Sequence, residues 1–473
     1  MTKILLINPP AAEGIKMVRE GRCMQREGAW AAVWAPISLA TIAAVLKKNR
    51  HKIKLIDAIV ENLDFTDIGI IIRGFDPDLI ILNTATGSII SDLSLASLAK
   101  KIKPRVLVAA FGIHVSVLPE ECLNSQPSLD FIIRGEPELT SLELADTISC
   151  RGDISQIKGI SYRHKNQLIN NPDRQLLKDL DSLPFPDWGE INTKNYRMPF
   201  SGKPFLLVAT GRGCPFQCLF CADRIYYGKN LRLPSPERVV DEIEDDINKY
   251  NVNEFLFWTE SFTLNRQYAI SVCQEIINRN LRIKFVVNSR VDNINQDLLN
   301  VLKKAGCFMI GFGIESGDDR LLLSMKKGIT VNQIKRAVIA SNEAGLDVTG
   351  HFMIGYPGET KRTIMKTIDL ACTLPFDFAQ FYCAVPFPGS DLYPLALKNK
   401  WLITDNWIRF EQNYSVIKTT KLTPNEVMHW RNVAYRKFYF RPKIIIRSIM
   451  SIRSIDALAW FTQSVFKFLN WTK

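Results

Sequence analysis

Several common sequence signals are missing from this chain of 473 residues. No stretch reaches the roughly 18 uncharged apolar residues that a membrane-spanning helix needs, which excludes a spanning segment. The apolar run Ile4–Ile7 near the N-terminus is too short for a secretory signal peptide. The ten cysteines show no regular spacing, which argues against a secreted disulfide framework. We therefore expect the protein to work in the reducing cytoplasm.

Other missing patterns exclude whole classes of function. No G-x4-G-K-[ST] pattern occurs, so phosphate binding by a P-loop is excluded. The spacing C-x2-C occurs once, so a pair of zinc knuckles is not available. No RNA-binding module is recognisable, and we expect no nucleic-acid partner. The length predicts two to four domains, and the 47% of hydrophobic residues is ample for their cores.

Three cysteines stand close together in the middle of the chain. Cys214, Cys218 and Cys221 have C-x3-C-x2-C spacing, directly after the expected strand Phe205–Ala209. Thiolates at this spacing converge on a cluster of soft metal, for which iron–sulfur is the usual case. Three ligands leave one iron of a four-iron cluster open to chelate and reduce a small molecule. Three unrelated core cysteines are the alternative, which the strand–loop context disfavours.

Strand and helix patterns alternate from about residue 198 to 395. Six strand–helix units indicate a partial, open TIM-like barrel, whose chemistry belongs at the C-terminal ends of its strands. The strands are expected at Phe205–Ala209, Phe255–Trp258, Lys284–Val287, Met309–Ile314, Asp347–Ile354 and Gln380–Val385. Charged and hydroxyl residues follow them: Glu260, Arg290, Glu315 and Ser316.

Five apolar runs alternate with helical patterns in the N-terminal third. They indicate a parallel, doubly wound sheet of flavodoxin-like type. Ligands on such sheets lie beyond the strand C-termini, near a switch point in strand order. Small and hydroxyl residues there let a backbone approach a large ligand closely. The candidates at these ends are Asn8, Thr84, Thr86, Gly112, His114, Gly135 and Glu136.

The cysteine motif, with Phe220 before its last cysteine, resembles the signature of the radical S-adenosylmethionine (SAM) enzymes. The barrel segments Gly311–Gly317 and Gly350–Thr360 are similar to segments that occur in the same order in that family. The resemblance implies a [4Fe–4S] cluster on Cys214, Cys218 and Cys221, with SAM on the open iron. It also implies that Glu260 accepts the SAM ammonium group, that Arg290 pairs with the SAM carboxylate, and that Glu315 and Ser316 face the SAM ribose and carboxylate. Thr259 stands where many relatives carry Asp, and an ordinary ion pair is the alternative role for Arg290.

A flavodoxin-like domain ahead of such a barrel is similar to the cobalamin-binding domain of the B12-dependent radical SAM class. The motif D-x-H-x-x-G is absent, because Gly112-Ile113 precedes His114. Many members of the class hold cobalamin without that histidine, so we still expect cobalamin. A domain that has lost this ligand, or that binds another, is the alternative. The insertion at 9–36 is a candidate cover for cobalamin or lining for a substrate channel, and its Cys23 is more plausibly inert than an axial ligand.

We divide the chain into a cobalamin-binding domain (1–150), a linker with a short hairpin (151–197), a radical SAM barrel (198–395) and a basic helical C-terminal region (396–473). The last region carries 14 Lys and Arg against 4 Asp and Glu, most of the net charge of +12. A helix is expected at Asn425–Phe440, with a break at Arg441-Pro442. The segment Lys443–Trp471 has a basic face opposite an Ile/Trp/Phe face, which is typical of an interfacial membrane helix. Docking of this helix on the barrel is the alternative.

The resemblance implies a radical SAM enzyme that takes an electron from an external reductant, such as flavodoxin or ferredoxin. The expected reaction is methyl transfer to an unactivated carbon or a phosphinate of a small-molecule or lipid-like substrate, in the cytoplasm or at the inner face of the membrane. Two alternatives stay open. One is a non-methylating relative, like the anaerobic magnesium-protoporphyrin cyclase, and the other is a cobalamin-binding protein with an inactive barrel.

Overall fold

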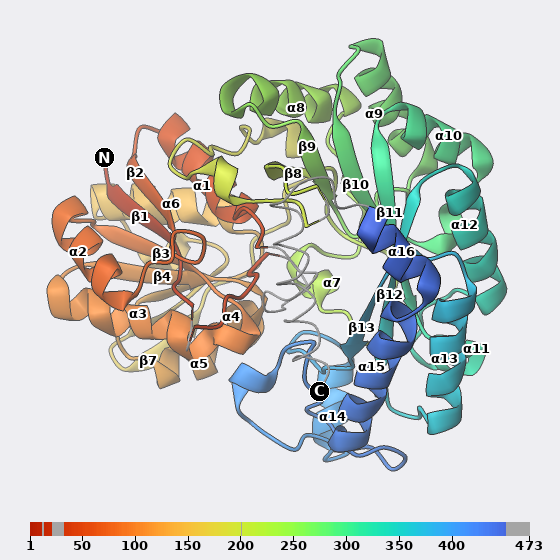
Figure 1. Cartoon of the computed structure of the whole chain (residues 1–473). Helices are drawn as coiled ribbons and strands as arrows, with labels where there is room; N and C mark the ends of the chain where they lie inside the picture. Colours follow the sequence, from red (N-terminus) through yellow and green to blue (C-terminus); the bar gives the residue numbers. More distant parts are fainter. Residues whose placement is uncertain (12–13, 21–32, 200, 451–473) are drawn as a thin grey trace.

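The computed structural model describes residues 1–11, 14–20, 33–199 and 201–450 (Figure 1). One mixed and one parallel sheet, each with its helices, form two lobes that lie side by side. Cys23 and the part of the predicted interfacial helix beyond Met450 lie outside the described residues.

The N-terminal lobe is built on a seven-stranded sheet in the order β2-β1-β3-β4-β5-β6-β7. The first five strands are parallel in the order 2-1-3-4-5, which is the flavodoxin-like arrangement predicted from the apolar runs. The predicted hairpin adds β6 and β7 to the edge of this sheet in antiparallel fashion. The strands are β1 (Lys3–Asn8), β2 (Lys52–Asp57), β3 (Leu79–Asn83), β4 (Leu107–Phe111), β5 (Phe131–Ile133), β6 (Ile160–His164) and β7 (Gln167–Asn170).

Helices cover both faces of this sheet, which is why its central strands are almost wholly apolar (Figure 1). A capping box between Asp64 and Asp67 starts the second helix, since both side chains satisfy backbone N–H groups of the first turn. The helices are α1 (Ile37–Lys48), α2 (Phe65–Phe75), α3 (Ile89–Ile102), α4 (Ile113–Val117), α5 (Pro119–Ser125) and α6 (Pro137–Cys150).

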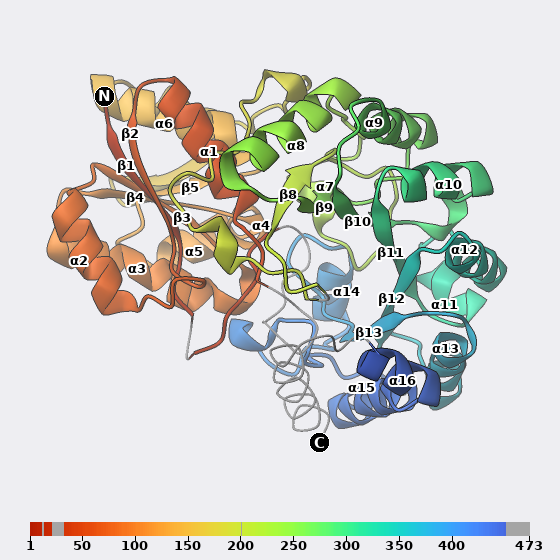
Figure 2. The ribbon, with the colours of Figure 1, turned by 45° about the horizontal axis from the view of Figure 1, so that its top comes forward.

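The second lobe is a six-stranded parallel sheet in the order β13-β12-β11-β10-β9-β8, with helices on its outer side (Figure 2). Its two edge strands, β8 and β13, are not neighbours in the sheet, so the barrel is open as predicted. The strands are β8 (Phe205–Ala209), β9 (Glu254–Trp258), β10 (Lys284–Ser289), β11 (Cys307–Glu315), β12 (Asp347–Ile354) and β13 (Phe378–Cys383). The helices are α7 (Asp223–Tyr226), α8 (Pro236–Tyr250), α9 (Arg266–Asn278), α10 (Gln296–Lys304), α11 (Asp319–Ser324), α12 (Val331–Glu343) and α13 (Lys361–Thr373).

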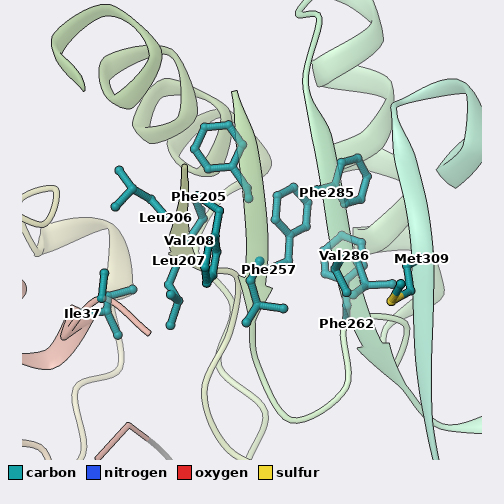
Figure 3. Packing of buried hydrophobic residues seen from close by; sticks show 14 of the residues in the cluster. Ile37, Phe205, Leu206, Leu207, Val208, Phe257, Phe262, Phe285, Val286 and Met309 are labelled. Atoms are coloured by element: carbon teal, nitrogen blue, oxygen red, sulfur yellow. The ribbon is translucent and has the colours of Figure 1, made fainter. Parts of the chain in front are cut away.

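One continuous apolar core joins the two lobes. Ile37 of α1 belongs to the same buried cluster as Leu206 and Val208 of β8, and Figure 3 shows these side chains next to one another. The Pro-aromatic linker adds to this contact, because Trp188 is fully buried and the Asp187 N–H donates to the carbonyl of Ala40 at 3.0 Å. A shared core of this kind holds the two lobes in a fixed relation.

The C-terminal region packs against the last barrel strand, where α15 lies beside α13. It contains α14 (Leu392–Lys398), the 3-10 turn η6 (Trp407–Arg409), α15 (Pro424–Tyr439) and α16 (Pro442–Met450), and the predicted break at Arg441-Pro442 separates the last two helices. The hydroxyl of Tyr439 in α15 donates to the carbonyl of Ala379 in β13 at 2.9 Å. In the part of the chain that the structure describes, no helix has the length and apolar character to cross a bilayer.

Candidate active site

A cavity of about 280 Å³ opens at the C-terminal ends of the barrel strands. Cys214, Cys218 and Cys221 line it, together with Glu260 and Glu315 from the ends of β9 and β11. The wall on the side of the N-terminal lobe includes Trp34, from the end of the 9–36 insertion. The barrel therefore brings the predicted cysteines and two predicted carboxylates to one chamber.

The loop that carries the cysteines is held by backbone hydrogen bonds. The Cys214 N–H donates to the carbonyl of Gly228 at 3.2 Å, and the Leu219 N–H donates to the carbonyl of Met325 at 3.0 Å. Gly213, which starts the loop, has φ +88°, and a Cβ there would lie 2.3 Å from the carbonyl oxygen of Asn230. Only glycine fits this turn, since a side chain would meet both backbone strain and a clash.

The three thiol groups line the same cavity. Within the described residues, no three His, Cys, Asp or Glu side chains converge tightly enough to hold one metal ion. A [4Fe–4S] cluster needs spaced thiolates, because each thiolate binds a different iron. All three cysteines are half-buried, which suits a cluster that must also meet a small molecule. The donor set fits the group that the sequence predicts.

The structure places Arg290 beside the cysteine loop, with its donor fork on a neighbouring carboxylate. Its guanidinium donates to both carboxylate oxygens of Asp292, at 3.0 and 2.9 Å, and to the carbonyl of Lys327 at 2.8 Å. It also stacks on the ring of Phe216, 3.5 Å from the centroid. In this structure the Arg290 guanidinium is therefore in an ordinary ion pair with Asp292, as the alternative predicted. Binding of a SAM carboxylate by Arg290 stays a prediction.

Glu315 faces a lysine that sequence reasoning missed. The Nζ of Lys327 lies 2.8 Å from Glu315 Oε1, and both side chains are about nine-tenths buried on the cavity wall. The same ammonium group lies 5.8 Å from the ring centroid of Phe220. Ser316 is not among the residues lining the cavity. It is fully buried, and its hydroxyl accepts a hydrogen bond from the Asp318 N–H at 3.2 Å.

The inner wall of the barrel carries a polar patch that the sequence motifs did not predict. His351 of β12 stacks on Tyr382 of β13 at a centroid distance of 6.0 Å, and the Tyr382 hydroxyl donates to Gln380. Below this patch the cavity is apolar, with Leu256, Val286 and Met309 from three adjacent strands. These side chains alternate with core residues along ordinary strands, so no local spacing marks them.

The predicted ligand-binding edge of the N-terminal lobe is closely packed. Asn8 donates to Asp57 at 2.8 Å, and the Thr84 hydroxyl donates to the carbonyl of Phe111 at 2.8 Å. Gly112 has φ +138°, and a Cβ there would lie 2.5 Å from the carbonyl oxygen of Thr84, so the crossing of these two strand ends requires glycine. Thr86 is fully buried in the short 3-10 turn that precedes α3.

His114 lies under the C-terminal region rather than at an open edge. Its ring packs edge-on against Trp407 of η6 at 4.7 Å, and burial lowers its pKa to about 4. Among the described residues, its Nδ1 has no hydrogen-bond partner. A neutral, buried and unpaired ring nitrogen beside small strand-end residues fits a large ligand that carries hydrogen-bonding groups at its periphery. No pattern in the sequence predicts the contact between His114 and Trp407.

A strap from the 9–36 insertion crosses the same strand ends. Arg19 forms a fully buried ion pair with Asp92 at 2.7 Å. Glu20 accepts hydrogen bonds from Ser38 at 2.8 Å and from Asn83 at 3.3 Å, and burial raises its pKa to about 8. Residues 14–20, which we call the strap, therefore cover part of the predicted ligand-binding edge. That the insertion covers cobalamin or lines a substrate channel stays a prediction.

Gly135 and Glu136 have different surroundings. Gly135 has φ +71° with open space where a Cβ would lie, so a ligand can approach its backbone. Glu136 instead forms buried ion pairs with two arginines of the barrel lobe, Arg212 and Arg232, at 3.1 and 2.9 Å. Its carboxylate is committed to the contact between the lobes, which conflicts with the predicted cofactor-binding role.

The structure packs a flavodoxin-like domain against an open barrel that carries three cysteines at its mouth. This combination is typical of enzymes that combine radical SAM chemistry with a second cofactor. Comparisons with known proteins agree. Residues 208–371 match the Radical SAM superfamily and residues 29–145 match the B12 binding domain. The chain belongs to the cobalamin-dependent radical SAM family. Its cofactors are a [4Fe–4S] cluster, SAM and cobalamin, and its class is a radical SAM methyltransferase.

The chain is similar to several characterised and uncharacterised members. It is 35% identical to an uncharacterized methyltransferase of Pyrococcus horikoshii over 94% of both chains. It is 29% identical to the anaerobic magnesium-protoporphyrin IX monomethyl ester cyclase of Cereibacter sphaeroides, over 87% of this chain and 68% of that protein. The fold is shared with the radical SAM methyltransferase TsrM from Kitasatospora setae (TM-score 0.74, 15% identity, 100% and 99% of the two chains). It is also shared with the cobalamin-dependent radical enzyme OxsB (TM-score 0.76, 16% identity, 99% and 72%).

Proposed function

We propose that this enzyme transfers a methyl group from SAM to an unactivated carbon of a small organic substrate bound in the barrel cavity. The observation that carries the proposal is the single chamber shared by Cys214, Cys218 and Cys221 with Glu260 and Glu315. The cofactors, when bound, supply a hydrogen-abstracting carbon radical and a transferable methyl group. An external one-electron reductant, such as flavodoxin or ferredoxin, completes the reaction.

The residues of the chain position and shield the reactants. The three cysteines hold the cluster, Glu260 accepts the SAM ammonium group, and Glu315 with Lys327 faces the rest of SAM. The pairing of Lys327 with Glu315 and of Arg290 with Asp292 leaves these wall charges balanced before any ligand binds. At the cobalamin edge, Asn8, Thr84, Thr86, Gly112, His114 and Gly135 are the proposed contacts.

The lower cavity supports an uncharged substrate core. Its floor is apolar, and the patch above it offers an imidazole, a phenol and an amide from His351, Tyr382 and Gln380. Such a surface binds a largely apolar body through a few hydrogen bonds, as in most small-molecule sites.

The test uses anaerobically reconstituted protein with dithionite and SAM that carries a labelled methyl group. The proposal predicts 5′-deoxyadenosine together with a labelled small-molecule product from a metabolite extract. Cys218→Ala must lose both products and the bound iron. Cys150→Ser is the matched control, because Cys150 is exposed on α6, outside the cavity, and its loss leaves all three readouts unchanged. Full activity in Cys218→Ala contradicts the proposal.

A non-methylating reaction is the second candidate, because the chain is similar over most of its length to the cyclase of Cereibacter sphaeroides. The same experiment separates the two functions. A non-methylating enzyme forms 5′-deoxyadenosine and consumes a substrate, but the label does not enter the product.

We also propose that the C-terminal corner associates with an anionic membrane surface. Phe440, Ile445 and Ile446 are 52, 41 and 56% exposed at the junction of α15 and α16. Three exposed cations lie on this part of the chain, namely Arg436, Lys437 and Lys443, and Asp369 of α13 lies near Cys372, as Lys437 does. Each cation near an anionic surface contributes about 1 kcal/mol, and the apolar side chains enter the interface.

Flotation with vesicles tests this surface. Wild type is expected to float with vesicles of phosphatidylglycerol and phosphatidylcholine but not with phosphatidylcholine alone. Ile445→Ser with Ile446→Ser is expected to abolish flotation. Ile70→Ser with Ile90→Ser is the control, because both residues are 59% exposed on the other lobe. Equal flotation of both double variants places the membrane contact elsewhere and contradicts the proposal.

A further inference from the structure

Four buried charges join the base of the cysteine loop to the cobalamin domain. Glu136 and Glu138 come from the start of α6, and Arg212 and Arg232 flank the loop at its two ends. All four side chains are about nine-tenths buried or more. We call this set the interlobe clamp.

The backbone groups of the two arginines pair with each other and so close the cysteine loop. The Arg212 N–H donates to the carbonyl of Arg232 at 2.9 Å, and the Arg232 N–H donates to the carbonyl of Arg212 at 2.9 Å. This isolated antiparallel bridge forms the neck of residues 213–231, which contain all three cysteines. The Arg232 guanidinium also donates to the carbonyl of Tyr227, inside the loop, at 2.7 Å.

Both side chains then reach the cobalamin domain. Arg212 donates to Oε1 of Glu136 at 3.1 Å and to Glu138 at 2.6 Å, while Arg232 donates to Oε2 of Glu136 at 3.1 Å. The second oxygen of Glu136 also accepts from the Leu177 N–H at 2.9 Å. Glu136 is the N-cap residue of α6 and Glu138 lies in its first turn, where the helix dipole favours a carboxylate.

The clamp has no net charge, because two glutamates balance two arginines next to the cysteine loop. A cluster on three thiolates is negatively charged, so two uncompensated arginines at the neck of its loop would stabilise the added electron. The glutamates cancel that effect. Removal of either glutamate leaves a buried arginine with an unsatisfied donor, which is costly in a low-dielectric contact.

We propose that Glu136 and Glu138 are positioning residues that hold the cysteine loop at a fixed place on the cobalamin domain and neutralise the two arginines at the neck of that loop. They act through Arg212 and Arg232 and touch no reactant. This inference rests on the proposed function only for its redox part, because the mechanical part concerns the folded chain without cofactors.

Two readouts test the clamp in Glu136→Gln and Glu138→Gln. In cluster-free protein, amide hydrogen exchange across residues 212–232 is expected to become about tenfold faster, as the loss of a charge-assisted hydrogen bond predicts. In reconstituted protein, the midpoint potential of the cluster is expected to become more positive, because a negative charge has been removed. Glu138→Asp, which keeps the charge, is expected to restore the potential and only part of the exchange protection.

Glu143→Gln is the matched control. It lies on the same helix and loses an ion pair with Arg174, which is not part of the cysteine loop. It is expected to leave both readouts unchanged. Variants at 136 and 138 that behave like Glu143→Gln in exchange overturn the mechanical role, and an unchanged potential overturns the electrostatic role. If wild type itself takes up no cluster, the proposed function fails, while the exchange arm still decides whether the clamp holds the loop.

Discussion

The ion pair between Lys327 and Glu315 gives the sharpest prediction about the cavity wall. Lys327→Met keeps most of the aliphatic stem but leaves the Glu315 carboxylate without its cation. The two charged atoms lie 2.8 Å apart, and the side chains are 9 and 10% exposed. With an effective dielectric of about 20, the gross attraction at this distance is about 6 kcal/mol. Desolvation of both groups offsets part of it, so loss of one partner is expected to cost about 3–5 kcal/mol.

Calorimetry of the cluster-free protein measures this cost. Because the two lobes share one core, we expect them to unfold together, and a loss of 3 kcal/mol then lowers the unfolding midpoint by about 3 °C. Lys327→Met with Glu315→Gln is expected to recover much of the loss, because no unpaired charge remains. Lys326→Met is the matched control, since that neighbouring lysine is exposed. A shift in Lys327→Met no larger than in the control, or a double variant no more stable than the single, refutes the reasoning.

Two further predictions concern the cysteine loop and the strap. Gly213→Ala is expected to lose most of its reconstituted iron, because its Cβ would lie 2.3 Å from a carbonyl oxygen. Gly358→Ala is the control, since Gly358 has a similar φ of +91° but open space around its Cβ, and this variant is expected to retain iron. Equal iron in both variants contradicts the assignment. Burial raises the pKa of Glu20 to about 8, so the folded state holds a proton that the unfolded state releases above its ordinary value of 4.5. The free energy of unfolding should therefore fall as the pH rises between those values and level off above pH 8, and Glu20→Gln should remove this component. A wild-type profile identical to that of Glu20→Gln between pH 5 and 8 would show that the carboxyl is not buried in this way.

The strands were predictable because parallel sheets covered on both faces require continuous apolar runs. β8 and β12 begin and end at the predicted residues, and the cysteine loop follows β8 as expected. The flavodoxin-like strand order followed from the alternation of strands and helices. These features depend on short segments, so a single sequence contains the needed information.

Features that depend on distant segments could not be predicted. His114 meets Trp407 only because the C-terminal region folds back across both lobes. Lys327, which follows α11, pairs with Glu315 at the end of β11, and no spacing signals that contact. Glu136 follows a strand, as a ligand contact would, but the arginines that bind it come from the other lobe. Burial of charge between lobes has no local pattern.

The central claim is that Cys214, Cys218 and Cys221 hold a cluster with one iron open to SAM. Electron paramagnetic resonance of the anaerobically reconstituted, dithionite-reduced protein, recorded before and after addition of SAM, tests it most directly. The account predicts the signal of a reduced [4Fe–4S] cluster whose g values change when SAM binds. Zinc in place of iron, or a cluster signal that SAM leaves unchanged, would contradict it.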